Sequence, residues 1–393
     1  MFGVHQTRHL LRSISTQSSK GHLRVVRAWN VDNACRFHSS SVRNAPEPFE
    51  ILFLGRDEFS CIVLEQLYGA RDVWQQISIA THPDAKAVRR ATLHTVSPLK
   101  LLGQELGLSV NHIPEDKADF KQWQPPVPFN RPPAGPSNHL LVTASFGRIL
   151  PDPLLNLFAP SRRLNVHPSL LPAYRGAAPI QHVIINGEKE TGVCVLGMVE
   201  LSKGLDSGDI WGKETVPIPE GSSYGSLRDT LAREGGSLLV SVLRDMLANK
   251  ASSTPQAVDP TRPRASMITN DTAHVDFTTQ TADVIARIDR AISHQRELKA
   301  YIPRNERSIK LQDCSVFEPS ALRQGFVLPE TPGAARFDST TKTMLVRCAG
   351  GTVLSVSKLK MQSRPLLLAK DWWNGTKEWR EEDGSILLTH LEL

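Results

Sequence analysis

The stretch FEILFLGRDEFSCIVLEQL, residues 49–67, decides the class of fold. Residues 49–55 form a short apolar run that ends at a glycine, which is typical of a buried strand followed by a turn. From Phe59 to Leu67 the apolar residues recur at the spacing of a helix. A strand, a glycine turn and a helix in succession predict the opening unit of an α/β sheet.

The same alternation continues toward the middle of the chain. Apolar runs predict strands at residues 77–80, 139–144, 163–167, 192–199 and 210–218, and helical spacing predicts helices at residues 98–106, 178–185 and 224–248. Strands that alternate with helices predict a largely parallel sheet that is covered on both faces.

The last third of the chain has a different pattern. Residues 251–266 are polar and rich in proline, which is typical of an interdomain linker. A helix at residues 281–293 precedes short strands at residues 308–317, 343–348 and 352–358, and this pattern predicts a small β-barrel. Residues 124–138 are also rich in proline and are expected to form a surface insertion without a functional signal of its own.

The first 45 residues differ in composition from the rest of the chain. They contain one acidic residue, Asp32, and seven basic residues: Arg8, Arg12, Lys20, Arg24, Arg27, Arg36 and Arg43. Such a leader is typical of a mitochondrial transit peptide, because the membrane potential draws a positively charged amphipathic helix inward. We expect the leader to be cleaved near residues 36–41 and the protein to lie in the mitochondrial matrix. The alternative is a disordered tail that has no targeting function.

Charge, cysteines and short motifs exclude several classes of function. The formal net charge of +6 permits a polyanionic partner without requiring one. No uncharged apolar run approaches the ~20 residues of a membrane helix. The five cysteines have no CxxC spacing, which argues against a disulfide framework or a Cys-rich zinc site and fits a reducing compartment. GxGxxG, GxxxxGK[ST] and HExxH are absent, so we expect no dinucleotide, nucleoside triphosphate or metal site.

The most informative stretch is LNVHPSLLPAYRGAAPI, residues 164–180. Asn165 and His167 are two residues apart on a predicted strand and therefore project to the same side. Pro168 ends the strand, which places both side chains at the carboxyl end, where open α/β sheets form their sites. Residues 169–172 add an apolar wall suited to a flat heteroaromatic ligand. Residues 204–209 supply the glycine-flanked Asp206 on a loop after another strand.

These residues could catalyse acyl transfer. His167 could exchange a proton near neutral pH, and the amide of Asn165 could donate a hydrogen bond to the oxygen of a tetrahedral intermediate. Asp206 could orient the imidazole or share its proton. The pattern is equally compatible with Asn165 and His167 satisfying each other at a strand end, since buried polar groups need partners in either case.

A resemblance to a known family favours catalysis. The segment NVHPSLLPAYRGAAPIQHVIINGEKETGV, residues 165–193, followed by GLDSGDI, residues 204–210, closely resembles the methionyl-tRNA formyltransferases. The similarity includes ILFLG at residues 51–55, THPD at residues 81–84, SPLKLLGQELGL at residues 97–108 and SFGRILP at residues 145–151. It covers residues 49–248 well and extends thinly to about residue 375.

The resemblance implies a Rossmann-like N-terminal domain that binds the co-substrate 10-formyltetrahydrofolate, and an OB-like C-terminal domain that holds tRNA. The family's catalytic asparagine, histidine and aspartate fall on Asn165, His167 and Asp206. Its formyl-folate loop falls on Ser169, Leu170, Leu171 and Pro172. The implied reaction is attack by the α-amine of methionyl-tRNA on the formyl carbon, which yields formylmethionyl-tRNA for mitochondrial translation initiation.

Two positions depart from the family pattern. The basic loop that in the family enters the acceptor stem falls here on residues 85–92, which lack glycine. Arg89 and Arg90 are the candidates for tRNA contact there; the alternative is a solvated pair of charges. Arg56 stands where the family has a small residue in its first loop.

Pattern and resemblance together divide the chain into five parts. These are a transit peptide (1–45), a formyltransferase domain (46–250), a linker (251–270), an OB-like tRNA-binding domain (271–375) and a tail (376–393). We expect a monomer with no metal and no membrane partner.

Three alternative functions remain. A sugar-nucleotide formyltransferase shares the NxHxSLLP core, but the RGAAPI run, the leader and the basic loop favour tRNA. Glycinamide ribonucleotide formyltransferase is less expected, because it is shorter and needs a glycine-rich phosphate loop. The third alternative is an RNA-binding factor on a retired catalytic fold, which has no need to keep Asn165, His167 and Asp206 together.

Overall fold

A computed structural model describes residues 47–86, 94–132, 137–257, 259–321 and 324–390. The predicted leader, residues 1–45, lies outside the described residues, as do Arg89 and Arg90. Among the described residues, none of the helices combines the length and apolar character that crossing a membrane requires.

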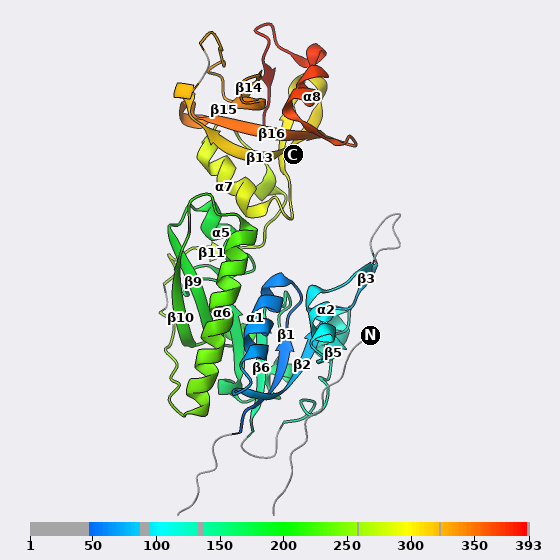
Figure 1. Ribbon diagram of the computed structural model, residues 1–393, viewed down its shortest axis with the longest axis vertical. Coiled ribbons are helices and arrows are strands. Elements are labelled where there is room, and N and C mark those ends of the chain that lie inside the picture. The colour runs from blue at the N-terminus through cyan, green and yellow to red at the C-terminus, as the bar shows by residue number, and fades with distance from the viewer. Residues whose placement is uncertain (1–46, 87–93, 133–136, 258, 322–323, 391–393) are drawn as a thin grey trace, which may run out of the picture. The chain divides into compact units, whose positions relative to one another are not determined.

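A seven-stranded sheet forms the centre of the N-terminal half (Figure 1). From β7 to β5 the neighbouring strands are parallel, whereas at the other edge β9 pairs antiparallel with both β7 and β10. The predicted α/β fold with a mostly parallel sheet is therefore confirmed. In spatial order the strands are β10 (Ile210–Pro217), β9 (Glu190–Gly197), β7 (Arg163–His167), β6 (His139–Ala144), β1 (Phe49–Leu54), β2 (Trp74–Thr81) and β5 (Ser109–His112).

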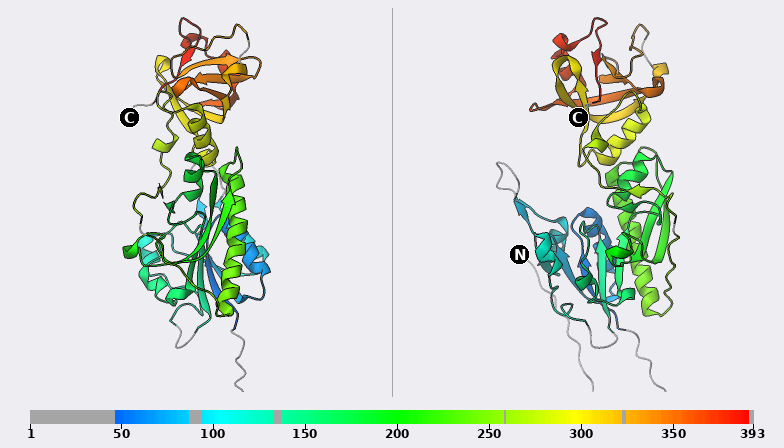
Figure 2. Two further views of the ribbon diagram at one scale, coloured as in Figure 1. Left: turned by 90° about the vertical axis from the view of Figure 1, so that its left-hand side faces the viewer. Right: turned by 180° about the vertical axis from the view of Figure 1, so that it is seen from behind.

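The central strand β1 is apolar except for the half-buried Glu50, because both faces of the sheet are covered. Ile51 and Phe53 pack in the core that contains α1 (Glu58–Gly69) and α6 (Tyr224–Leu247), and Figure 2 shows these two helices from further directions. The alternate residues of β1 face a second core. That core contains Leu52, Leu54, Phe120, Phe129, Phe146 and Phe158.

The order of the strands determines where a ligand can bind. The chain moves outward from β1 to β2 and β5, and then returns to the other side of β1 through β6. The topological switch point therefore lies between β1 and β6, and open α/β sheets bind ligands outside the carboxyl ends of the strands near this point. Strand β7, which carries Asn165 and His167, is the next neighbour of β6.

The C-terminal part forms an antiparallel, nearly closed, barrel-like sheet with α7 (Ala282–Ile292) and α8 (Ala369–Asn374) packed against it. The predicted strands at 308–317, 343–348 and 352–358 correspond to β13, β15 and β16. Strands β12, β14, β17 and β18 were not predicted. The bounds are β12 (Leu298–Ile302), β13 (Arg307–Phe317), β14 (Ala334–Asp338), β15 (Thr343–Arg347), β16 (Val353–Met361), β17 (Leu366–Leu368) and β18 (Ile386–Leu387).

Short elements complete the chain. The helices among them are α2 (Pro98–Glu105), α3 (Lys117–Lys121), α4 (Asp152–Leu155) and α5 (Pro179–Ile185). The short strands are β3 (Ala85–Lys86), β4 (His94–Thr95), β8 (Arg175–Gly176) and β11 (Arg264–Ala265). Strands β3 and β4 pair with each other at the base of the predicted basic loop.

Residues 251–266, expected as an interdomain linker, are tied to the catalytic domain along their length. Thr254 exchanges two backbone hydrogen bonds with Ile210, both 2.9 Å long. The Tyr174 N–H donates to the Pro263 carbonyl at 2.6 Å, and β11 pairs in parallel with β8. Residues 251–266 are therefore held by backbone hydrogen bonds to the segment after β7 and to the start of β10.

Two further segments are more closely packed than their composition suggested. In the proline-rich insertion, Phe129 is only 1% exposed and packs against Phe158 with ring centroids 5.9 Å apart. In the predicted tail, residues 376–393, β18 pairs with β14, and Ile386 and Leu388 are buried. Burial of these few apolar side chains determines the position of each segment.

Candidate active site

Asn165 and His167 lie at the carboxyl end of β7 and share one face of it. In the pairing of β6 with β7, Asn165 lies opposite Thr143. The Thr143 hydroxyl donates to Asn165 Oδ1 at 2.8 Å. This bond assigns the amide oxygen to Thr143, so the Nδ2 hydrogens of Asn165 are the groups that can donate to a substrate oxygen.

The imidazole of His167 is buried, with 4% of the residue exposed. Its Nε2 lies 3.1 Å from the Tyr174 carbonyl oxygen. Because a carbonyl can only accept, Nε2 carries the hydrogen in this bond, and Nδ1 of the neutral ring is then an acceptor. Nδ1 is therefore the nitrogen that can take a proton.

Asp206 approaches the same nitrogen from the loop after β9. Its Oδ2 lies 3.8 Å from His167 Nδ1 and accepts a hydrogen bond of 3.0 Å from the Gly176 N–H. The 3.8 Å separation is within ion-pair range but too long for a direct hydrogen bond. Proton exchange between His167 and Asp206 therefore requires a small movement of one side chain toward the other or a bridging water molecule.

The Asp206 backbone has a φ of 51°, in the left-handed region that residues with a side chain rarely adopt. Gly204, two residues earlier, has a φ of 109°. Such unusual backbone conformations persist only where the surroundings enforce them, and they cluster at functional sites. The loop therefore holds the carboxylate in one orientation toward His167.

Part of the predicted folate loop, residues 169–172, is buried and held by a hydrogen bond and apolar packing. The Ser169 hydroxyl donates to the Ala173 carbonyl at 2.9 Å, and Leu171 packs with Cys194 and Leu196. Leu170 and Pro172 remain half-buried at the loop surface. A buried base beneath a partly exposed apolar surface suits a flat heteroaromatic ligand such as a pterin, so these residues fit the proposed co-substrate.

A cavity of about 260 Å³ adjoins this loop at Pro172. Arg175, Arg262 and Arg264 line it, and its acidic residue, Asp259, pairs with Arg262 at 3.0 Å. The cavity therefore has an excess of positive charge beside the predicted catalytic residues, which suits an anionic group such as a phosphate.

The loops at the switch point contribute charged groups of their own. The Ser145 hydroxyl donates to Asp57 Oδ2, and burial is the main cause that raises the pKa of Asp57. Arg56, which departs from the family pattern, is exposed, and its guanidinium lies against Gly147. The larger side chain is thus accommodated by a glycine on the neighbouring loop.

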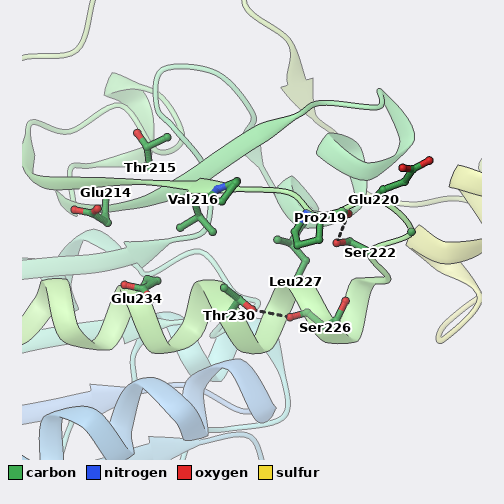
Figure 3. Close-up of a pocket in the computed structure, with 12 residues that line it drawn as sticks. Glu214, Thr215, Val216, Pro219, Glu220, Ser222, Ser226, Leu227, Thr230 and Glu234 are labelled. Atoms are coloured by element: carbon green, nitrogen blue, oxygen red, sulfur yellow. Dashed lines mark hydrogen bonds between the residues drawn. The ribbon is translucent and has the colours of Figure 1, made fainter.

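A second cavity, of about 640 Å³, lies between β10 and the first turns of α6 (Figure 3). Its lining includes Glu214, Glu220 and Glu234 and none of the predicted site residues. Three carboxylates repel an anionic substrate, so we assign the reaction to the carboxyl end of β7. Within the described ranges, no three histidine, cysteine or acidic side chains are grouped so that they could hold a metal ion.

The structure therefore brings together all the predicted catalytic and folate-loop residues, while Arg89 and Arg90 lie outside the described ranges. The sequence interpretation missed Thr143, Tyr174 and Gly176 as hydrogen-bond partners of the site. Tyr174 and Gly176 act through main-chain atoms, for which side-chain motifs give no signal. Thr143 could have been found from its place at the end of the strand preceding β7.

A carboxyl-end site with an amide donor, a histidine and a carboxylate beside an apolar loop defines a group-transfer enzyme of the formyltransferase class. Residues 103–243 match the family described as Formyl transferase, and residues 267–377 match Formyl transferase, C-terminal domain. The methionyl-tRNA formyltransferase of Lactiplantibacillus plantarum is 30% identical over 84% of this chain and 96% of its own length. The methionyl-tRNA formyltransferase of Staphylococcus aureus is 29% identical over 84% of this chain and 96% of its own length. The chain belongs to the methionyl-tRNA formyltransferase family.

Two solved structures share the fold. WlaRD, a sugar 3N-formyl transferase determined in the presence of dTDP and 5-N-formyl-THF, has a TM-score of 0.53 and 16% identity over 81% of this chain and 100% of its own. HypX from Aquifex aeolicus, in complex with tetrahydrofolic acid, has a TM-score of 0.51 and 15% identity over 86% of this chain and 51% of its own. Both comparisons support the architecture described above.

Proposed function

We propose that this formyltransferase uses 10-formyltetrahydrofolate as donor and the α-amine of initiator methionyl-tRNA as acceptor. The observation that carries the proposal is the convergence of Asn165, His167 and Asp206 beside residues 169–172. Family membership adds that the curated relatives, which this chain matches over 96% of their length, bear the name of that reaction.

The reaction proceeds through a tetrahedral intermediate. The amine nitrogen attacks the formyl carbon, and the oxygen that becomes negative is stabilised by the Asn165 amide. His167 Nδ1 accepts the proton that the amine loses, and the Asp206 carboxylate stabilises the resulting imidazolium. The bond between the formyl carbon and N10 of the folate then breaks, N10 receives the proton that His167 had accepted, and tetrahydrofolate leaves.

The positive cavity favours a polyanionic acceptor. Arg175, Arg262 and Arg264 lie where phosphates near the reacting amine of an RNA could be held. Arg89 and Arg90 are proposed as a second RNA contact on the loop between β3 and β4. A sugar nucleotide is the competing acceptor, because it also carries phosphates and because a sugar formyltransferase shares the fold.

We further propose that the protein acts in mitochondrial translation initiation and that residues 1–45 direct it to the matrix. The support is their composition, seven basic residues against a single acid. Import of a fusion of residues 1–45 to a reporter into isolated, energised mitochondria tests this part. A reporter that stays outside contradicts it without affecting the enzymatic proposal.

One assay tests the choice of acceptor. The protein is incubated with 10-formyltetrahydrofolate and either charged initiator tRNA or a dTDP-linked amino sugar, and the formylated product is identified. We expect formylation of the tRNA, with kcat/KM falling steeply as salt rises because phosphate contacts release counterions. Formylation of the sugar nucleotide alone would overturn the proposal.

A further inference from the structure

Gln256 connects residues 251–266 to the catalytic loop. Its Nε2 donates to the Asp206 carbonyl at 2.8 Å and to the Gly208 carbonyl at 2.7 Å. Its Oε1 accepts two bonds from Arg175, at 3.0 Å from Nε and 2.6 Å from Nη2. Carbonyls can only accept and a guanidinium can only donate, so these four bonds fix the orientation of the amide.

The two carbonyls belong to the loop that carries the catalytic acid. Asp206 has the left-handed φ of 51°, so its main chain needs external support to stay in place. The Gln256 amide supplies that support on the main chain of Asp206 itself and again two residues later. The carboxylate of Asp206 is left to face His167.

The oxygen of the Gln256 amide accepts from Arg175, which is next in sequence to the hydrogen-bond partner of the Asp206 carboxylate. Arg175 precedes Gly176, whose N–H donates to Asp206 Oδ2. Gly176 in turn lies so close to β11 that a side chain there would meet the Ala265 carbonyl at 2.3 Å. The Gln256 side-chain amide therefore connects the main chain of Asp206 to Arg175, the residue before Gly176, whose N–H donates to the Asp206 carboxylate.

We infer that Gln256, within residues 251–266, is a positioning residue for Asp206. The inference rests on the proposed catalytic role of Asp206. Gln256 touches no reacting atom in this account. It keeps Asp206 Oδ2 within ion-pair range of His167 Nδ1, at 3.8 Å, where the carboxylate can stabilise the imidazolium, and a displacement of ~1 Å in such a group lowers a rate by about 10²-fold.

The first test separates positioning from substrate binding. Gln256→Met keeps the length of the side chain and removes all four hydrogen bonds, whereas Gln256→Glu keeps the acceptor for Arg175 and loses the donor to both carbonyls. We expect kcat to fall about 10- to 100-fold in both, with each KM within about threefold of the original. Ser253→Ala is the matched control, because Ser253 donates from the same segment at 3.2 Å to Asp209, outside the catalytic set.

The second test is a double-mutant cycle with Asp206→Asn, measured in single turnovers. If Gln256 acts through Asp206, Gln256→Met should lower the rate less than about threefold once Asp206 is replaced, because residues that act as a unit are non-additive. A full, additive loss in that background would overturn the inference. Should Gln256→Met fail to fold, Gln256→Glu takes its place in the cycle.

The outcomes distinguish this inference from the proposed function. Full activity of Asp206→Asn would refute the catalytic role of Asp206 and the inference with it. Loss of activity in Asp206→Asn, together with unchanged kcat in both folded Gln256 variants, would refute the inference alone.

Discussion

His167 at the end of β7 and Asp206 on the loop between β9 and β10 face each other, with Nδ1 of the imidazole 3.8 Å from Oδ2 of the carboxylate. Each group is held by a main-chain partner on the far side: the Tyr174 carbonyl for His167 Nε2, and the Gly176 N–H for Asp206 Oδ2. Both partners belong to the segment that follows the folate loop. The side chains of His167 and Asp206 are thus aligned by two main-chain groups that are two residues apart, the Tyr174 carbonyl and the Gly176 N–H.

This relationship predicts the effect of replacing either partner. His167→Gln should lower kcat by about 10²- to 10⁴-fold, the usual contribution of a positioned proton-transfer group. Asp206→Asn keeps the shape and the acceptor for Gly176 but removes the charge, so we expect a smaller loss of kcat. Steady-state formylation assays with melting temperatures as the folding control check this. Full activity in a folded His167→Gln would exclude the histidine from the chemistry.

Thr143 offers a second prediction, on the orientation of Asn165. Thr143→Val keeps the volume but removes the hydroxyl that donates to Asn165 Oδ1, so the amide can turn over and present its oxygen to the substrate. We expect kcat to fall about tenfold, since a misdirected donor weakens stabilisation of the oxyanion. Thr143→Ser keeps the donor and is the matched control. Equal kcat in the valine and serine variants would show that the hydroxyl has no role.

The parts of the molecule that the sequence predicted well are those with a regular apolar pattern. Two of the parallel strands, β6 and β7, begin and end as predicted, and five of the six residues of β6 are buried. Asn165 and His167 were paired correctly because a strand repeats every two residues. These signals are local, so no knowledge of the tertiary structure is needed to read them.

The contacts that sequence reasoning missed connect distant parts of the chain. Gln256 is 50 residues from Asp206 and 81 from Arg175, and Thr143 is 22 residues from Asn165. A hydrogen bond between such positions leaves no periodic pattern. In residues 251–266 the composition could not show which groups are fixed, because proline and polar residues occur both in free linkers and in linkers held by main-chain hydrogen bonds.

The third prediction concerns Phe129 in the proline-rich insertion. Phe129→Ala should lower the free energy of unfolding by about 3–5 kcal/mol, because it empties a site that is only 1% exposed in the second core. Val127→Ala, two residues earlier and 74% exposed, is the control and should change it by less than about 0.5 kcal/mol. Urea unfolding monitored by fluorescence measures both. Equal, small effects would show that the insertion is not part of the core.

The last prediction concerns pH and the histidine at the end of β2. His82 Nε2 lies 2.9 Å from the Phe146 carbonyl, and its pKa is lowered, chiefly by burial and further by Arg148 and Arg56. The unfolded chain therefore binds this proton at a higher pH than the folded chain. The contribution of neutral His82 to stability is complete above the unfolded pKa of about 6.5 and is lost as the pH falls from there through the folded value.

His82→Gln isolates this contribution, because glutamine can donate to the Phe146 carbonyl but does not titrate. We expect the free energy of unfolding to fall less between pH 7 and pH 5 in the variant than in the original protein. Denaturant titrations at several pH values measure the difference. The variant His139→Gln serves as a comparison, because His139 contacts Glu50 at 3.5 Å and takes no part in the Phe146 contact. An identical pH dependence in His82→Gln and the original protein would show that burial does not hold His82 neutral in the folded chain.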